Sequence, residues 1–114
     1  MSTAQQVRRI FDKLPETFIP EKANGVRSSI QFNLSGDGGG NWLVTIADNR
    51  VLVEERQVED ADLTFAMDAR DYVGIMTGKS SPMILFTMGR IRTEGDLALA
   101  WKFRELFDPD RAQS

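Results

Sequence analysis

Four short segments of this chain alternate apolar and polar side chains with a period of two residues. Because successive side chains of a strand point to opposite faces, this period predicts strands with one apolar and one wet face. In the first segment, Ile30, Phe32 and Leu34 share the apolar face, and Gln31 lies on the wet one. The segments are "VRSSIQFNLSG" (26–36), "WLVTIA" (42–47), "VLVEER" (51–56) and "LTFAMD" (63–68). We therefore expect a largely antiparallel sheet with one apolar face.

Helical periodicity surrounds these strands. Residues 4–14 place apolar side chains at helical spacing, and Pro15 is expected to end that helix. Residues 69–78 predict a helix capped by Asp68, and "SSPMILFTM" (80–88) predicts a second, shorter one. A short strand, "GRIRTEG", and an amphipathic helix, "DLALAWKFRELF", follow. The order helix, four strands, two helices, strand, helix is typical of an α+β fold with helices on the apolar side of a sheet.

Composition excludes several classes of function. The 114 residues include no cysteine and no histidine, which excludes a thiolate or imidazole metal site, a cysteine nucleophile and a histidine base. The formal net charge is −3 and the basic residues form no stripe, so nucleic acid is not an expected partner. No segment approaches the ~20 apolar residues of a membrane span, and the start lacks a signal-peptide pattern, so a cytoplasmic protein is expected. The length predicts a single domain over residues 1–114.

The polar residues do not form a recognisable catalytic arrangement. The acidic turn "VEDAD" (58–62) has no matching cluster of carboxylates elsewhere, although a hard metal ion needs several converging oxygens. Glu54 and Glu55 are neighbours on a strand, so their carboxylates point to opposite faces. Ser80 and Ser81 have no histidine to activate them. The sequence therefore predicts no catalytic residue, no metal ligand and no cofactor.

The most unusual apolar stretch covers the end of the first central helix and the whole of the second. Residues 80–89 carry no charge, and residues 74–89 hold three of the five methionines. Methionine is unbranched and adapts its shape, so a cluster of methionines favours a surface that repacks around variable apolar partners. Two interpretations stay open on this evidence, a plain core and an apolar ligand cavity. We expect burial, rather than membrane insertion, to explain the missing charges.

A series of short motifs between Ala61 and Phe107 resembles the C-terminal half of the sterol carrier protein-2 family of lipid-binding domains. In that family a strand with an Asp-hydrophobic-Thr pattern leads to a helix that ends in glycine, a short helix after a proline, a Gly-basic-hydrophobic-basic strand, and Gly-Asp before a last helix. The corresponding residues here are Asp62 to Thr64, Gly78, Pro82, Gly89 to Arg92, and Gly95 to Ala98. The earlier strands follow the family's order, so the resemblance covers about residues 7–107, the expected core of the domain.

The resemblance implies both a fold and an activity. The fold is a single five-stranded, mostly antiparallel sheet with helices packed on one face, enclosing an apolar tunnel. The implied activity is non-catalytic binding and carriage of a hydrophobic ligand, which is a fatty acid, an acyl-CoA ester, a phospholipid or a sterol-like molecule. The implied partner is this lipid. We also expect transient contact with a membrane, because the ligand has to be loaded from one, and a homodimer belongs to the alternative function described below.

Given that fold, twelve residues are predicted to line the tunnel. Its opening is expected between residues 78–88 and residues 101–107, and Lys79, Arg90 or Arg92 are candidates to meet a charged headgroup. The predicted lining residues are Phe32, Trp42, Val44, Phe65 and Met67 on the sheet side, and Tyr72, Met76, Met83, Phe86, Met88, Phe103 and Phe107 on the helix side.

Two other functions remain as alternatives at this stage. The same apolar groove could dock a partner protein or a second copy of the chain, with no small-molecule ligand. A small enzyme acting on a bound lipid is disfavoured by the missing histidine and cysteine, although Tyr72 or a carboxylate could still supply an acid.

Overall fold

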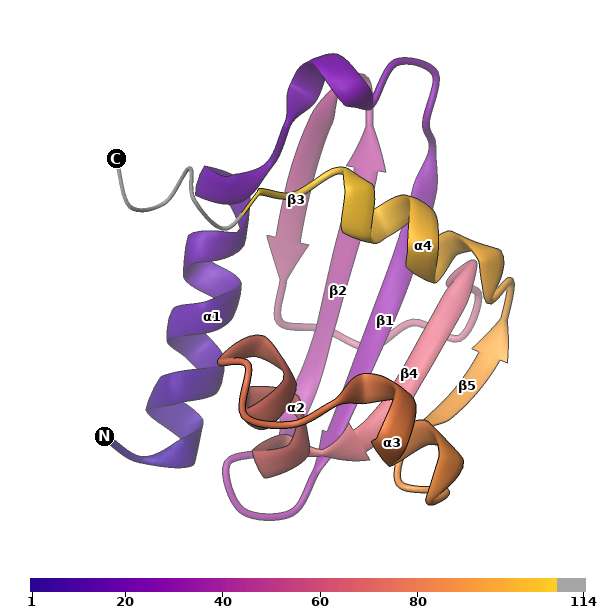
Figure 1. Ribbon diagram of the computed structural model, residues 1–114. Coiled ribbons are helices and arrows are strands. Elements are labelled where there is room, and N and C mark those ends of the chain that lie inside the picture. Colours follow the sequence, from indigo (N-terminus) through magenta and orange to yellow (C-terminus); the bar gives the residue numbers. More distant parts are fainter. Residues whose placement is uncertain (109–114) are drawn as a thin grey trace.

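The computed structural model describes residues 1–108, so the last six residues of the expected domain lie outside the described part. Five strands form one sheet in the order β3-β2-β1-β4-β5 (Figure 1). Neighbouring strands are antiparallel except for β1 and β4, which are parallel. The strands are β1 (Ser28–Ser35), β2 (Gly40–Ala47), β3 (Arg50–Glu54), β4 (Leu63–Asp68) and β5 (Arg92–Gly95). This confirms the predicted α+β class with a five-stranded, mostly antiparallel sheet.

The alternation along the strands sets the register of the sheet. Phe32 on β1 lies opposite Trp42 on β2 and opposite Phe65 on β4, so the apolar sets of three strands share one face. All the helices pack over that face (Figure 1). They are α1 (Thr3–Thr17), α2 (Ala69–Met76), α3 (Pro82–Thr87) and α4 (Ala98–Glu105), together with a short 3-10 turn, η1 (Pro20–Lys22). We call this side of the sheet the covered face.

The first helix is longer than predicted, because it continues through Pro15 to Thr17. A proline in the last turn removes one backbone donor, but the Thr17 hydroxyl donates to the Leu14 carbonyl (2.8 Å) and the Phe18 amide donates to the Pro15 carbonyl (3.3 Å). At the other end, Ser2 caps the helix. The prediction that Pro15 ends this helix was therefore wrong.

The opposite face of the sheet is not uniformly wet. Gln31, predicted to face water, has no exposed surface. The segment from β3 to β4 crosses this face, because β4 lies on the far side of β1 from β3 (Figure 1). The Gln31 amide donates to the carbonyls of Trp42 (3.2 Å) and Arg56 (3.0 Å), and its oxygen accepts from the Val58 amide (2.9 Å). The Gln31 side chain thus helps to hold the crossing segment against the sheet.

Gln31→Leu is expected to lower the free energy of unfolding by roughly 1–3 kcal/mol, the range for a buried polar group left without its partner. The variant leaves the Arg56 carbonyl and the Val58 amide without the partner that they have in the native protein. Urea denaturation measures the loss. Asn33→Leu is the matched control on the same strand and face, because the buried Asn33 Oδ1 has no hydrogen-bond partner to lose. Equal losses in the two variants would contradict the role given to Gln31.

Candidate functional site

An aromatic cluster fills the space between α1, α2 and the covered face. Phe11 of α1 stacks on Trp42 with 4.6 Å between ring centroids and on Tyr72 with 5.1 Å, and its edge meets Phe32 at 5.5 Å. All four side chains are buried. At this end, the space beneath the helices is occupied by the protein's own rings.

A second line of aromatic rings leads away from Phe32 toward α4. Phe32 lies 5.6 Å from Phe65 and 6.2 Å from Phe103, and Phe103 lies 4.6 Å from Phe107, measured between ring centroids. Phe65, Phe103 and Phe107 are only half-buried, unlike Phe32. Between β4 and α4, therefore, aromatic surface is within reach of molecules in the solvent.

The structure divides the twelve predicted lining residues into two groups. Eight belong to one apolar cluster on the covered face, namely Phe32, Trp42, Val44, Phe65, Met67, Tyr72, Phe103 and Phe107. The other four, Met76, Met83, Phe86 and Met88, are exposed at the end of α2 and along α3. Leu99 also packs against the cluster although it was not among the predicted residues, and its spacing of four from Phe103 on one helix was the signal that could have found it.

The uncharged stretch 80–89 is not buried, contrary to expectation. Its helix, α3, has six residues, and Leu85 is the one buried residue among them. The Ser81 side chain caps the helix by accepting from the Ile84 amide (3.3 Å). So short a helix contacts the core through a single position, which leaves its other apolar side chains at the surface.

Burial raises the pKa of the Tyr72 hydroxyl far above the ordinary value of a tyrosine. The phenol therefore stays neutral at physiological pH and serves as an apolar wall rather than as an ionising group. The protein stability depends on pH through this group only above its unfolded value of about 10, where the unfolded chain loses the proton and the folded one keeps it.

Stability is accordingly expected to fall as the pH rises above about 10. Tyr72 is the single tyrosine of the chain, so tyrosinate absorbance in the ultraviolet reports on it alone. The folded protein should show no tyrosinate at a pH where the urea-unfolded chain is already ionised. Tyr72→Phe, which keeps the ring, should remove the absorbance change and this part of the pH dependence. Tyrosinate appearing in the folded protein at the ordinary pKa would contradict the burial argument.

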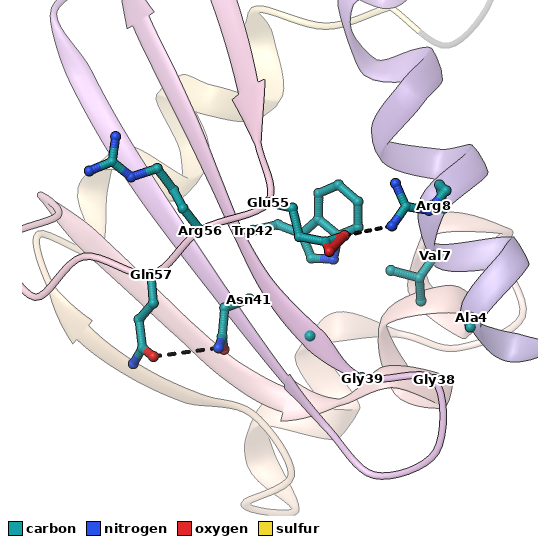
Figure 2. Close-up of a pocket in the computed structure, with 11 residues that line it drawn as sticks. Ala4, Val7, Arg8, Gly38, Gly39, Asn41, Trp42, Glu55, Arg56 and Gln57 are labelled. Carbon is teal, nitrogen blue, oxygen red and sulfur yellow. Dashed lines mark hydrogen bonds and ion pairs between the residues drawn. The ribbon is translucent and has the colours of Figure 1, made fainter.

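Two cavities open elsewhere on the molecule; the wall of the smaller one is mainly polar, and that of the larger one is mixed. One of about 360 Å³ lies between the start of α1, the β1–β2 turn and the end of β3. Figure 2 shows Arg8 across this cavity from Glu55, with which it forms an ion pair (2.7 Å); its guanidinium also lies 5.3 Å from the centre of the Trp42 ring. The other, of about 560 Å³, has Asn33, Ala66 and Arg92 in its wall, on the face opposite the helices. Apart from Trp42 and Met67, the predicted lining residues lie outside both cavities.

The basic residues proposed to meet a headgroup lie apart from one another. The Arg90 guanidinium makes two hydrogen bonds to the Asp71 carboxylate (2.9 and 3.0 Å). Arg92 is exposed on the wall of the larger cavity, and Lys79 is exposed after α2. Within residues 1–108, no three carboxylates converge in a way that could hold a metal ion, and no helix is long and apolar enough to cross a bilayer.

Comparison with known proteins identifies the family. Residues 3–108 match the SCP-2 sterol transfer family, which is nearly the whole chain. The chain belongs to this family. The match confirms the resemblance on which the sequence-based expectations rested, and it is consistent with lipid binding.

Relatives in this family include much longer proteins. Hydroxysteroid dehydrogenase-like protein 2 of Xenopus tropicalis is 31% identical over 96 residues, which cover 82% of this chain and 23% of that protein. The same protein of Xenopus laevis is 26% identical over 104 residues, 90% of this chain and 25% of the relative. The chain thus spans about a quarter of the length of the curated relatives it matches.

Solved structures of the SCP-2 fold superpose on most of the chain. The sterol carrier protein domain 2 of Helicoverpa armigera has a TM-score of 0.69 and 24% identity, covering 96% of this chain and 90% of that one. Palmitated SCP2L2 from Aedes aegypti has a TM-score of 0.64 and 22% identity, covering 92% and 93%. A stereoselective inverting sec-alkylsulfatase from Pseudomonas sp. has a TM-score of 0.75 and 19% identity, covering 87% of this chain and 16% of the sulfatase. At these identities the likeness establishes the fold alone.

Proposed function

We propose that this chain is one lipid-binding domain that holds a single hydrophobic ligand on the covered face of its sheet and carries it without chemical change. The observation that carries the proposal is a line of aromatic rings that runs from half-buried Phe65 through buried Phe32 to half-buried Phe103 and Phe107. An apolar chain inserted there would displace water from aromatic surface on both the sheet side and the helix side. The expected compartment is the cytoplasm.

The energy available to such a site is set by apolar burial. Removing a long acyl chain from water contributes roughly 0.8 kcal/mol for each buried methylene, and part of this is lost in ordering the chain. Half-buried rings also need little rearrangement to accept a ligand, because they already lie on one surface. Membership in the SCP-2 family supports a lipid of this kind, and the comparison with a palmitated protein of the same fold favours a fatty acyl chain.

Catalysis is not part of the proposal, because the lining side chains supply no suitable chemistry. The lining is aromatic and aliphatic, and the Tyr72 hydroxyl has its pKa raised by burial, so it is a poor proton donor. The longer relatives are named hydroxysteroid dehydrogenase-like proteins, but this chain matches only about a quarter of their length. A role as the lipid-holding part of a larger assembly is compatible with carriage.

The direct test is to identify what the protein carries. Protein purified from cells without detergent is denatured, extracted and analysed by mass spectrometry, and about one lipid per chain is expected. In parallel, a fluorescent fatty acid is titrated into the delipidated protein, and saturable binding with a blue shift is expected. An extract free of lipid, together with no response of the fluorescent fatty acid, would contradict the proposal.

A protein-interaction module is the second candidate, and the exposed side chains of α3 favour it. If the apolar groove docks a second copy, sedimentation should show a stable dimer that takes up no fatty acid. A monomer that binds fatty acid would support lipid carriage and contradict the interaction module.

A further inference from the structure

One row of side chains crosses four strands on the face of the sheet opposite the helices. Asn33 of β1 lies opposite Ala66 of β4, and Ala66 lies opposite Arg92 of β5. On its other side, Asn33 lies opposite Asn41 of β2. Partners in a sheet point to the same face, and Asn33 and Ala66 each follow a residue of the covered face. The whole row therefore lies on the other side of the sheet.

The larger cavity lies over this row, with Ala66 as its floor. Ala66 has the smallest side chain of the four, and neighbouring strands are spaced so that Asn33 and Arg92 flank it about 10 Å apart. The volume of about 560 Å³ is ordinary for a ligand pocket. The segment that crosses from β3 to β4 contributes no residue to the wall, so it leaves this part of the sheet uncovered. We call the cavity the Ala66 hollow.

The Asn33 side chain supplies an acceptor that the protein itself does not use. Its Oδ1 is buried and has no hydrogen-bond partner within residues 1–108. Most buried polar atoms of folded proteins are hydrogen-bonded, so an exception requires an explanation. The last torsion of an asparagine side chain is broad, and a rotation about it turns the oxygen into the hollow, where it can accept from a ligand.

Two opposite charges in the wall of the hollow do not pair with each other. Arg92 is exposed and forms no ion pair in the described part of the chain. The Asp68 carboxylate, at the end of β4, lies 3.6 Å from the Arg70 guanidinium instead. Arg90 also lines the hollow, but two hydrogen bonds already join it to Asp71. The hollow thus presents an unpaired guanidinium on β5 and a carboxylate on β4.

We propose that the Ala66 hollow binds a small zwitterion whose ammonium and carboxylate are separated by a few atoms, as in an ω-amino acid or a dipeptide. The ligand carboxylate meets the planar Arg92 guanidinium, which suits two parallel hydrogen bonds. The ligand ammonium donates to the Asn33 Oδ1 and lies near the Asp68 carboxylate. A simple anion would leave Asn33 and Asp68 without a counterpart, and Arg92 would repel a metal ion.

The Ala66 hollow is separate from the proposed lipid site. Phe65 belongs to the aromatic line on the covered face, and the next residue, Ala66, lies on the other face. Arg92, a candidate for a lipid headgroup in the sequence, lines the hollow instead. A lipid and a zwitterion can therefore occupy the domain together, and this inference does not depend on lipid carriage.

Three matched small molecules test the class of ligand by two-dimensional proton–nitrogen NMR. The probe γ-aminobutyrate carries both charges, γ-hydroxybutyrate replaces the ammonium by a hydroxyl, and butyrate carries the carboxylate alone. We expect saturable shifts of the Asn33 side-chain amide and the Ala66 backbone amide with γ-aminobutyrate. The other two should bind about tenfold more weakly, because they lack the charged donor. No saturable shift with γ-aminobutyrate, or equal affinity for all three probes, would overturn the proposal.

Two variants and a control locate the site. Arg92→Gln removes the cation and Asn33→Leu removes the acceptor, and each is expected to bind γ-aminobutyrate about tenfold more weakly or worse. Arg50→Gln is the control, because Arg50 is also an exposed arginine on a strand but lies on β3, outside the hollow. The NMR spectrum of each variant checks its fold. Equal affinity in Arg92→Gln and Arg50→Gln would place the site elsewhere and overturn the assignment.

Uptake of the fluorescent fatty acid separates this inference from the proposed function. Arg92→Gln should take up the fatty acid as the original protein does, while its binding of γ-aminobutyrate is weakened. Loss of fatty-acid uptake in Arg92→Gln, with no response of the original protein to γ-aminobutyrate, would assign Arg92 to a lipid headgroup and overturn the second site. Binding of γ-aminobutyrate by a protein that takes up no fatty acid would support the second site and contradict carriage.

Discussion

Phe103→Glu is expected to abolish binding of a fluorescent fatty acid while leaving the protein folded. Phe103 is half-buried, lies between Phe32 and Phe107, and belongs to a helix with no fully buried residue, so a carboxylate there can turn toward water. A ligand lying along the aromatic line would have to desolvate that carboxylate, which costs far more than one aromatic contact contributes. Titration of the delipidated variant, with circular dichroism to check the fold, measures the effect.

The matched control for this substitution lies on the same helix. Ala98 is exposed at the start of α4, and Ala98→Glu makes the same change of charge away from the aromatic line. We expect Ala98→Glu to bind the fatty acid like the original protein. If the folded Phe103→Glu variant still binds the fatty acid, Phe103 is not part of the site. If both variants lose fatty-acid binding, the added negative charge alone explains the loss.

Phe11→Ala is expected to produce the largest loss of stability of any single substitution considered. Phe11 is fully buried and contacts Phe32, Trp42 and Tyr72, so the substitution opens a cavity at the junction of α1, α2 and the sheet. Such a change costs about 3–5 kcal/mol, against a total stability of roughly 5–15 kcal/mol for a domain. Urea denaturation at neutral pH measures it.

Two comparisons make the Phe11 result interpretable. Arg9→Ala, on the exposed side of the same helix, should change stability little. Phe11→Leu should lie between the original protein and Phe11→Ala, because it restores volume but not ring stacking. A loss below about 1 kcal/mol in Phe11→Ala would show that the ring cluster does not hold α1 to the sheet.

The sheet and its covered face were predictable because alternation is a local and redundant signal. Phe32, Trp42 and Phe65 each belong to a separate alternating segment, and their pairing across three strands follows once those segments share a face. The helix caps Asp68 and Ser81 were equally local, since each bonds to an amide two or three residues ahead. Of the eight predicted lining residues that share one cluster, the five on strands follow from this alternation.

The errors arose where a residue's environment depends on distant chain segments. Gln31 is buried because the chain crosses behind it after β3, a path that its own neighbours in sequence do not encode. Pro15 remains helical because of hydrogen bonds made by Thr17 and Phe18 that offset the missing donor. The exposure of Met83 and Met88 reflects how little of α3 touches the core, which composition alone does not reveal.

The parallel pairing of β1 with β4 has a consequence for how the chain acquires its structure. Ile30 and Leu63 are partners across this pair. A hydrogen bond from the Ile19 amide to the Leu106 carbonyl (2.8 Å) joins the segment after α1 to the end of α4. During synthesis, α1 and the meander of β1, β2 and β3 emerge before β4. Until β4 follows, the β1 edge of the meander is unpaired, and the part of the covered face that α2 and α4 will cover is open. Contacts so distant in sequence imply refolding in milliseconds to seconds rather than microseconds, which stopped-flow fluorescence can time. Throughout that interval the nascent surface that will hold lipid is open to any apolar molecule nearby, so a ligand present early could be enclosed as the final helix docks.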